Sequence, residues 1–309
     1  MSDLNEGASG VYVIAVTPFA EDGSLDLTST DRMVEFYLEK GATGLTILGM
    51  MGEAPKLTAE EARTFVQRVL KRVDGRLPVV VGVSAPGLAP MGELSRSVMD
   101  EGASGVMVAP TPALRTDDQI YTYYEMVVET LGGAPLVLQD FPLVTNVQIS
   151  VPVILRIVEA FPTCVMLKHE DWPGLSKISA LRAASDRGEG RRVSILVGNG
   201  GVFLPEELAR GADGAMTGFA FPEMMVDVWR AHAAGDTEHA RDLFDAYLPL
   251  ARYEQQPGIG LTIRKYILAK RGAIASGTVR KPGGRLSALD IAEVEHLMAR
   301  QARRLSSIN

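Results

Sequence analysis

The chain is organised around residues 165–171, which read Val165-Met166-Leu167-Lys168-His169-Glu170-Asp171. A short apolar run with strand character ends in a lysine, and charged residues follow at once. In parallel α/β proteins, catalytic residues lie where a buried strand reaches solvent. A lysine amine attacks a carbonyl only in its neutral form, and its ordinary pKa is about 10.4, so catalysis requires a weakly solvated setting. The mouth of a closed sheet is such a setting.

Lys168 also has a simpler interpretation. A lysine at the end of a strand often reaches solvent or pairs with a nearby carboxylate, here Glu170 or Asp171. On spacing alone this structural role is the more common one. Strand alternation places Lys168 and Glu170 on one side of the strand and His169 on the other, among the covering helices. Glu170 is therefore the better partner for proton transfer.

Strand-like and helical segments alternate along the chain. The helical ones include 27–40 and 58–73, and the second begins with Thr58-Ala59-Glu60-Glu61, a capping-box sequence. The strand-like segments are short, rich in valine and mostly apolar on both faces, as expected of a parallel sheet covered by helices. They are residues 11–17, 45–48, 79–83, 106–109, 136–139, 165–168, 194–197 and 215–217.

A repeated loop supports this alternation. The pattern Gly-Ala-x-Gly, followed by an apolar strand, occurs at 41–44, 102–105 and 211–214, and its first glycine suits the left-handed position after a helix. We therefore predict an α/β fold, a (β/α)8 TIM barrel over residues 11–235. Residues 236–309 are expected to form a helical extension, with helical patterns at 237–254, 260–271 and 287–304. Such helices form an interface or, more commonly, only bury apolar stripes.

Composition limits the classes of partner. The chain has 309 residues, is 46% hydrophobic and carries a net charge of −7 without a basic block, which argues against nucleic acid or an anionic membrane as a partner. Its single cysteine, Cys164, excludes an internal disulfide framework. Neither a signal peptide nor an apolar stretch of membrane-spanning length is evident. These features favour a cytoplasmic protein with small-molecule ligands.

The carboxyl ends of the predicted strands supply the candidate site residues. Two glycines bracket Met50 and Met51 in a turn whose backbone N–H groups could converge on a carboxylate, although an ordinary βα loop is an equal alternative. A metal site is not favoured, because His169 is isolated from the three other histidines. The strand-end candidates are Thr17, Gly49, Met50, Met51, Gly52, Glu53, Ser84, Pro110, Thr111, Gln139, Asp140, Lys168, Glu170, Gly198, Asn199 and Thr217.

Several motifs occur in an order that resembles the dihydrodipicolinate synthase and N-acetylneuraminate lyase family of class I aldolases. The resemblance extends over nearly the whole chain, and it is specific for the family but not for a substrate. It is carried by Thr17-Pro18-Phe19, Asp22-Gly23-Ser24-Leu25-Asp26, Gly49-x-x-Gly52-Glu53, Leu57-Thr58-x-x-Glu61 and Lys168 at the end of the sixth strand.

The resemblance implies an imine between Lys168 and the carbonyl of pyruvate or a related 2-oxo acid. Backbone N–H groups of the Met50-Met51 turn would hold the carboxylate. The protonated imine is an electron sink, so an adjacent carbon–carbon bond or leaving group can be made or broken without a metal or other cofactor. The oligomeric assembly that is usual in the family also suggests a homo-oligomer, a dimer or tetramer, although the family's cross-subunit tyrosine is absent here.

Some positions depart from the family pattern. Two threonines of the turn are replaced by Met50 and Met51, and Pro110-Thr111-Pro112 lacks the usual tyrosines. The resemblance aligns Gln139 with the tyrosine that shuttles protons, and Val144 with the arginine that grips the aldehyde substrate. An amide cannot titrate and valine cannot bind an anion, so these changes argue against the lysine-pathway synthase reaction and for a second substrate less anionic than aspartate semialdehyde.

Three functions remain as hypotheses. The first is a Schiff-base lyase or aldolase for a 2-oxo acid or 2-oxo-3-deoxy sugar acid, in which Glu170, or else Asp140, moves protons and Gln139 orients the imine or a water. The second is a non-catalytic binding or regulatory barrel that has lost its proton relay. The third, a phosphate-binding isomerase, is based only on Gly198-Asn199-Gly200-Gly201 and ranks last.

Overall fold

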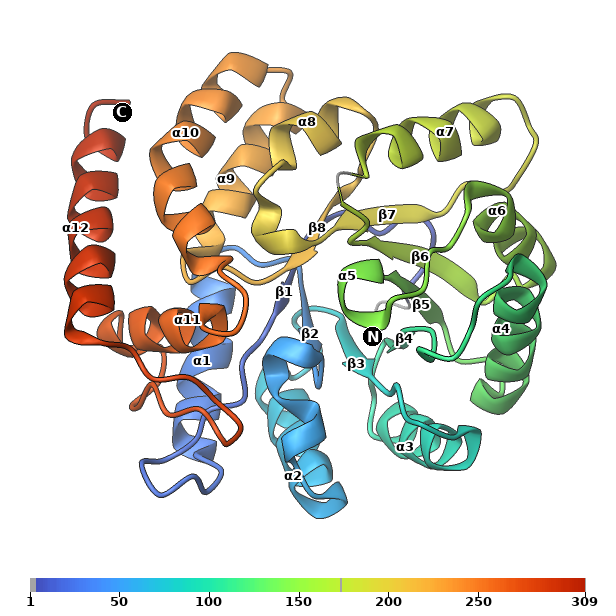
Figure 1. Ribbon diagram of the computed structural model, residues 1–309, viewed down its shortest axis with the longest axis horizontal. Helices are drawn as coiled ribbons and strands as arrows, with labels where there is room; N and C mark the ends of the chain where they lie inside the picture. The colour runs from blue at the N-terminus through green and yellow to red at the C-terminus, as the bar shows by residue number, and fades with distance from the viewer. Residues whose placement is uncertain (1–3, 173, 309) are drawn as a thin grey trace.

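Eight short parallel strands close into a barrel in the computed structural model, which describes residues 4–172 and 174–308 (Figure 1). Each strand pairs with the next, and β8 pairs with β1 to complete the circle. The predicted (β/α)8 barrel is therefore confirmed. The strands are β1 Gly10–Ile14, β2 Gly44–Ile47, β3 Val79–Gly82, β4 Gly105–Val108, β5 Leu136–Asp140, β6 Cys164–His169, β7 Ser194–Val197 and β8 Gly214–Thr217.

Side chains alternate between the inside of the barrel and the layer of helices around it. In β1, Val11 and Val13 pack in the helix layer, whereas Tyr12 and Ile14 belong to the cluster inside the barrel. Gly44 leaves room for the Tyr12 ring, since a Cβ atom there would lie 2.4 Å from a ring carbon. The interior cluster is a packed core and not a pore; it contains Leu4, Tyr12, Ile14, Val80, Met107, Val137, Val165, Met166, Leu196 and Met216.

A ring of helices surrounds the strands (Figure 1). The predicted capping box at Thr58 is present, because its side chain accepts from the N–H of Glu61 while Glu61 accepts from the N–H of Thr58. The helices of this ring are α1 Leu27–Glu39, α2 Ala59–Val73, α3 Leu88–Asp100, α4 Asp117–Leu131, α6 Val151–Ala160, α7 Leu175–Asp186, α8 Leu204–Ala209 and α9 Pro222–Ala233. Short turns at the barrel mouth are η1 Met50–Gly52, η2 Ala54–Lys56, α5 Pro142–Thr145 and η3 Asn199–Gly201.

The first strand is shorter than its sequence pattern predicts. The expected strand 11–17 ends at Ile14, and the N–H of the next residue, Ala15, still donates to the backbone oxygen of Thr46 in β2. The Thr17 hydroxyl donates to the backbone oxygen of Gly52 over 2.5 Å. Thr17 therefore fastens the loop after β1 to the turn after β2.

Three helices follow the barrel, close to the predicted ranges. They are α10 Thr237–Glu254, α11 Gly260–Lys270 and α12 Ala288–Leu305. Helix α10 packs between α9 and α12, on the side of the barrel that also carries α1 (Figure 1). Within the described ranges, none of the helices has the length and apolar content that a membrane span needs.

Candidate active site

Lys168 lies on β6 with its side chain inside the barrel mouth. The residue is only 5% exposed, and its Nζ atom lies 2.7 Å from Oε2 of Glu170, which is equally buried. His169, the residue between them, points into the helix layer, where its Nε2 atom lies 3.0 Å from the backbone oxygen of Gly174. Strand alternation thus places the amine and the carboxylate together, as predicted.

A cavity of about 190 Å³ opens beside Lys168. Since a water molecule takes up about 30 Å³ in the liquid, this space suits a small organic acid. We call it the Lys168 cavity. It is lined by Ile14, Met50, Met51, Gln139, Phe141, Val144, Lys168, Glu170, Asn199, Gly200, Thr217, Gly218, Gln255 and Arg264.

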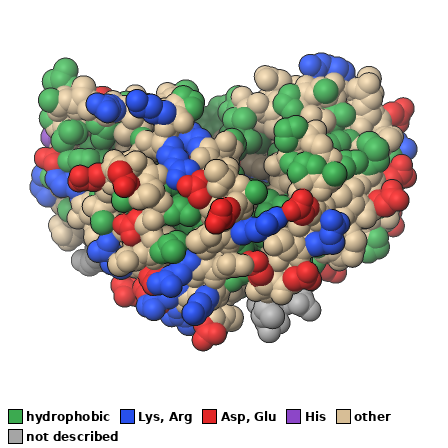
Figure 2. Space-filling model, turned by 90° about the horizontal axis from the view of Figure 1, so that it is seen from below, with side chains coloured by type: hydrophobic (Ala, Val, Ile, Leu, Met, Phe, Trp, Pro, Cys, Tyr) green, Lys and Arg blue, Asp and Glu red, His purple; other side chains and the backbone are tan. Residues whose placement is uncertain are grey.

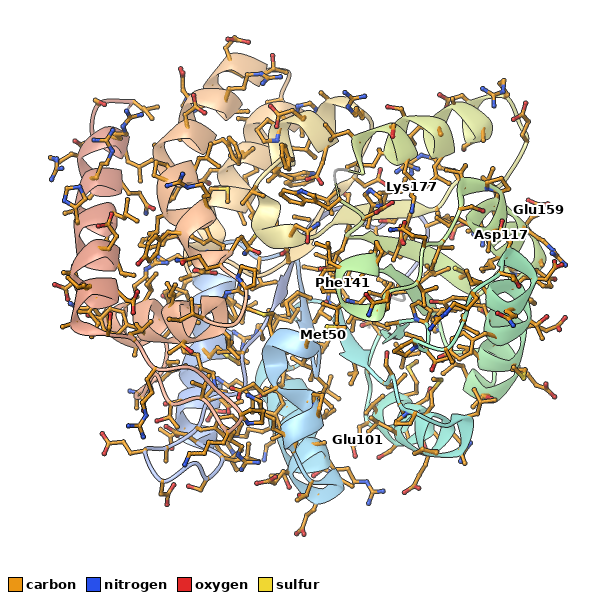
Figure 3. The ribbon with its side chains drawn as sticks, in the orientation of Figure 1. Met50, Glu101, Asp117, Phe141, Glu159 and Lys177 are labelled. Carbon is orange, nitrogen blue, oxygen red and sulfur yellow. The ribbon has the colours of Figure 1, made fainter. Side chains whose placement is uncertain are left out.

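One wall of the Lys168 cavity is apolar. Met50 and Phe141 come from the loops after β2 and β5, and both lie near the centre of the barrel in Figure 3. In the side view of Figure 2, a notch in the upper edge of the molecule has hydrophobic side chains along its walls. The same view shows acidic and basic side chains intermixed over the rest of this face. Apolar walls around a few polar groups are typical of small-molecule sites.

Gln139 holds the Glu170 carboxylate in place. Gln139 and Lys168 are register partners on β5 and β6, so both side chains enter the barrel at the same level. The Gln139 amide Nε2 donates to Oε2 of Glu170 over 2.7 Å, the oxygen that also faces the amine of Lys168. An amide fixes a neighbour by hydrogen bonding but takes no proton. Glu170 is therefore the group in this triad that can carry a proton away from the amine.

The loop after β7 supports Glu170 from the other side. The Asn199 side chain donates to the backbone oxygen of Glu170 over 3.2 Å. The hydroxyl of Thr217 accepts from the N–H of Gly200 over 2.8 Å, which ties this loop to the end of β8. Gly198 does not line the cavity, but it lies directly against the Glu170 side chain.

The Met50-Met51 turn forms one turn of 3₁₀ helix at the mouth. The N–H of Gly52 closes it by donating to the oxygen of Gly49 over 3.0 Å. The first N–H groups of a helical turn have no partner within that turn, and here they belong to Met50 and Met51, both of which line the cavity. Gly49 and Gly52 shape the turn but do not contribute to the lining.

Asp140 and Glu53 are among the candidate residues that lie outside the cavity. Asp140 follows Gln139 in β5 and therefore points into the helix layer, where Lys177 Nζ donates to it over 2.8 Å. Glu53 forms a buried ion pair with Lys265 at 2.5 Å and a partly exposed one with Lys56 at 2.9 Å. The structure therefore does not bring Asp140, predicted as a catalytic residue, or Glu53, predicted as a substrate-binding residue, into the lining of the Lys168 cavity.

Two lining residues come from the carboxyl-terminal helices. Gln255 follows α10, and Arg264 lies on α11. The strand-end rule does not reach them, because helical periodicity does not reveal where an added helix docks. The only sequence signal is an arginine in an otherwise apolar stretch, Gly260-Leu261-Thr262-Ile263-Arg264.

A buried lysine at the end of the sixth barrel strand, with a carboxylate and a small cavity beside it, defines the class of lysine-dependent, class I aldolase-type lyases. Comparison with known sequences agrees, since the sequence model of the dihydrodipicolinate synthetase family matches residues 7–301. The chain belongs to this family, and it is a Schiff-base aldolase-type lyase. The non-catalytic alternative is not favoured by its relatives.

The relatives carry more than one activity in their names. The L-2-keto-3-deoxyarabonate dehydratase of Azospirillum brasilense is 30% identical over 278 residues, which are 88% of each chain. The 4-hydroxy-tetrahydrodipicolinate synthase of Parabacteroides distasonis is 28% identical and covers 81% of this chain and 82% of its own. A crystal structure described as dihydrodipicolinate synthase from Rhodopseudomonas palustris is 52% identical, covers 96% of this chain and 99% of its own, and has a TM-score of 0.95.

Proposed function

We propose that Lys168 forms an imine with C2 of a 2-oxo-3-deoxy sugar acid and that the protein then removes water from this substrate. The observation that carries the proposal is the 2.7 Å contact between Lys168 Nζ and Glu170 Oε2 at the edge of the Lys168 cavity. It pairs a nucleophile with a proton acceptor at the place where a 2-oxo acid would bind.

Imine formation begins when Glu170 takes a proton from the Lys168 ammonium group. The neutral amine attacks C2, and the carbonyl oxygen takes one proton from the amine and the proton held by Glu170 and leaves as water. This step gives a protonated imine and returns Glu170 to its carboxylate form. The free N–H groups of Met50 and Met51 hold the adjacent carboxylate. Orientation of the substrate in this way places C3 beside Glu170.

Dehydration needs only a further movement of one proton. Glu170 removes a proton from C3, and its electrons flow into the imine to give an enamine. The enamine expels the C4 hydroxyl group, which takes the proton back from Glu170 and leaves as water. Hydrolysis of the conjugated imine releases the product and restores Lys168, so the overall reaction loses one water molecule and requires no oxidant.

The composition of the cavity supports dehydration over the synthase reaction. Among the described residues that line it there is no tyrosine, and Gln139 and Val144 occupy the positions to which the resemblance assigns a proton-shuttling tyrosine and an anion-binding arginine. A dehydratase that uses a single carboxylate needs neither. The similarity to a protein named L-2-keto-3-deoxyarabonate dehydratase agrees with this choice.

We further propose that the enzyme works without a metal, as a cytoplasmic homo-oligomer. The protonated imine supplies the electron sink that a metal ion would otherwise provide. Activity should therefore persist after dialysis against a chelator. Light scattering on the purified protein should give the mass of a dimer or tetramer.

Trapping tests the proposal directly. Incubation with pyruvate and borohydride should add the mass of one reduced pyruvate, and peptide mapping should locate it on Lys168. The Lys168→Ala variant should lose the adduct, whereas Lys177→Arg, a control at a partly buried lysine outside the cavity, should keep it. No adduct with pyruvate or a panel of 2-oxo acids, or an adduct elsewhere, contradicts the proposal. Loss of 2-oxo-3-deoxypentonate, followed by NMR, tests the dehydration step.

A further inference from the structure

Arg264 is a buried guanidinium group with one unused end. It is 2% exposed, its Nε donates to Oε1 of Glu254 over 2.6 Å, and its Nη2 donates to the backbone oxygen of Gly218. Its Nη1 atom is buried and has no hydrogen-bond partner among the described residues. Buried N–H groups are almost always paired, so an unpaired one calls for an explanation.

The unused end of Arg264 lies against Gly218 at the edge of the Lys168 cavity. Both residues line this cavity. A Cβ atom at position 218 would lie 2.1 Å from Nη1. The guanidinium group therefore occupies the space that a side chain at residue 218 would fill, and the glycine allows it to reach the cavity.

The charge of Arg264 is compensated within the protein. Both oxygens of Glu254 accept hydrogen bonds, Oε1 from Arg264 and Oε2 from the N–H of Ala220 over 3.0 Å, as an ionised carboxylate does. Glu254 is 1% exposed, so solvent screens the pair little. Because the pair is already neutral, Nη1 requires an acceptor atom but not a negative charge.

We propose that Arg264 is a specificity residue whose Nη1 group donates to a hydroxyl oxygen in the carbon chain beyond C3 of a polyhydroxylated 2-oxo acid. This assignment rests on the proposed function, because it needs the acid to be anchored at Lys168. The apolar side chains of Met50, Phe141 and Val144 form another part of the lining, so the chain's hydroxyl groups find their donors on the Arg264 side. Binding a hydroxyl here gives Nη1 the hydrogen-bond acceptor that it lacks among the described residues.

Gln255 offers a second polar contact on the same side. A Cβ atom at Gly200 would lie 2.0 Å from the Gln255 Nε2 atom, so this amide also reaches the cavity across a glycine. Two helices of the carboxyl-terminal extension thus present polar groups to the cavity over residues that lack side chains. We expect a short 2-oxo acid such as pyruvate, which has no hydroxyl groups, not to need them.

The test compares substrates with and without the hydroxyl groups in the Arg264→Lys variant, which keeps a cation beside Glu254 but removes Nη1. Wild-type kcat/KM should be about 10- to 100-fold higher for 2-oxo-3-deoxypentonate than for its 5-deoxy analogue, as the loss of a charge-assisted hydrogen bond predicts. In Arg264→Lys this ratio should fall toward one. The matched control is Arg271→Lys, at an arginine near the end of the same helix that pairs with Glu223 outside the cavity. It should keep the wild-type ratio.

Three results separate the two proposals. Failure of wild-type protein to trap pyruvate on Lys168 overturns the proposed function itself. Normal trapping with the same substrate ratio in wild type and Arg264→Lys overturns only the role of Arg264. A wild-type preference for 2-oxoglutarate over the hydroxylated acid, lost in the variant, would assign the guanidinium to a carboxylate and also overturn it.

A structural measurement serves if the variant does not fold. Wild-type crystals treated with 2-oxo-3-deoxypentonate and borohydride should show a hydroxyl oxygen within about 3.2 Å of Arg264 Nη1. A reduced adduct whose hydroxyl groups all lie away from Nη1 would contradict the assignment.

Discussion

A Cβ atom at Gly198 would lie 2.1 Å from Cγ of Glu170. The missing side chain at the end of β7 therefore creates the space in which the proton-accepting carboxylate lies. Gly198 has a φ of −109°, so the backbone there does not demand glycine, and the need is one of space. A functional glycine of this kind cannot be recognised from a Gly-Asn-Gly-Gly sequence, which reads as a turn or a phosphate loop.

The Gly198→Ala variant should fold but lose most of its turnover. The new methyl group displaces Glu170 from Lys168, and correctly placed acid–base groups are worth about 10²- to 10⁴-fold in rate. Steady-state kinetics should show a fall in kcat of that order, while pyruvate trapping at long times persists. The control is Gly87→Ala, whose added Cβ would meet its nearest atom at 3.8 Å. Unchanged kcat in Gly198→Ala would show that the Glu170 position is not critical.

Replacement of Glu170 by glutamine separates proton transfer from imine formation. The amide keeps the shape of the side chain but cannot accept a proton. We expect kcat to fall by about 10²- to 10⁴-fold, with the same final yield of the borohydride-trapped adduct. Asp140→Asn is the informative companion, because Asp140 pairs with Lys177 outside the cavity. It should leave kcat within a few fold of wild type, and a larger loss in Asp140→Asn than in Glu170→Gln would reverse the two roles.

Glu53 should matter for stability and not for chemistry. It forms a buried ion pair with Lys265, and burial, opposed by Glu53, lowers the pKa of that lysine to about 8. Glu53→Gln leaves the lysine without its countercharge, which typically costs about 3–5 kcal/mol of unfolding free energy. Chemical denaturation should show this loss. Lys56→Met, which removes the more exposed partner of Glu53, should cost about 1 kcal/mol or less.

Glu207 on α8 should make stability depend on pH. Burial, with a smaller effect from Glu206, raises its pKa from 4.5 to about 8, and its Oε2 has no hydrogen-bond partner among the described residues. The folded state therefore favours the neutral acid, while the unfolded chain ionises near its ordinary value. The stability that this group contributes is complete below pH 4.5 and declines as pH rises to about 8, by about 3–5 kcal/mol.

Thermal unfolding across this pH range tests the Glu207 prediction. Glu207→Gln should remove the decline, so the variant should be more stable than wild type above pH 8. Glu206→Gln, at a carboxylate whose side chain is 37% exposed, should leave most of the decline in place. Parallel curves for wild type and Glu207→Gln would contradict the assignment.

Local patterns in the sequence were enough to predict the barrel and much of its mouth. Period-two alternation placed Lys168 and Glu170 together, because the inward direction of a strand residue depends only on its neighbours. The same rule, applied to Gln139, would have turned Asp140 outward, where the structure has it. The position of a residue at a strand end therefore predicts a site residue only when the in-and-out alternation of side chains along the strand is also considered.

Features that depend on distant parts of the chain could not be predicted in this way. Arg264 reaches the cavity because α11 docks on the barrel and Gly218 leaves a gap. The amino-acid sequence around residue 264 predicts neither feature. The ion pair of Glu53 with Lys265 could not be foreseen, because the two residues are 212 positions apart in the sequence. Long-range pairing of this kind requires the fold.

The packed interior of the barrel affects how substrate and product reach and leave Lys168. Among the described residues, Tyr12 and Met166 belong to the packed cluster that fills the inside of the barrel. We therefore expect the acid to enter and the product to leave through the same barrel mouth and to occupy the same binding site. The product must therefore leave the binding site before the next substrate molecule can bind. The product should act as a competitive inhibitor of its own formation.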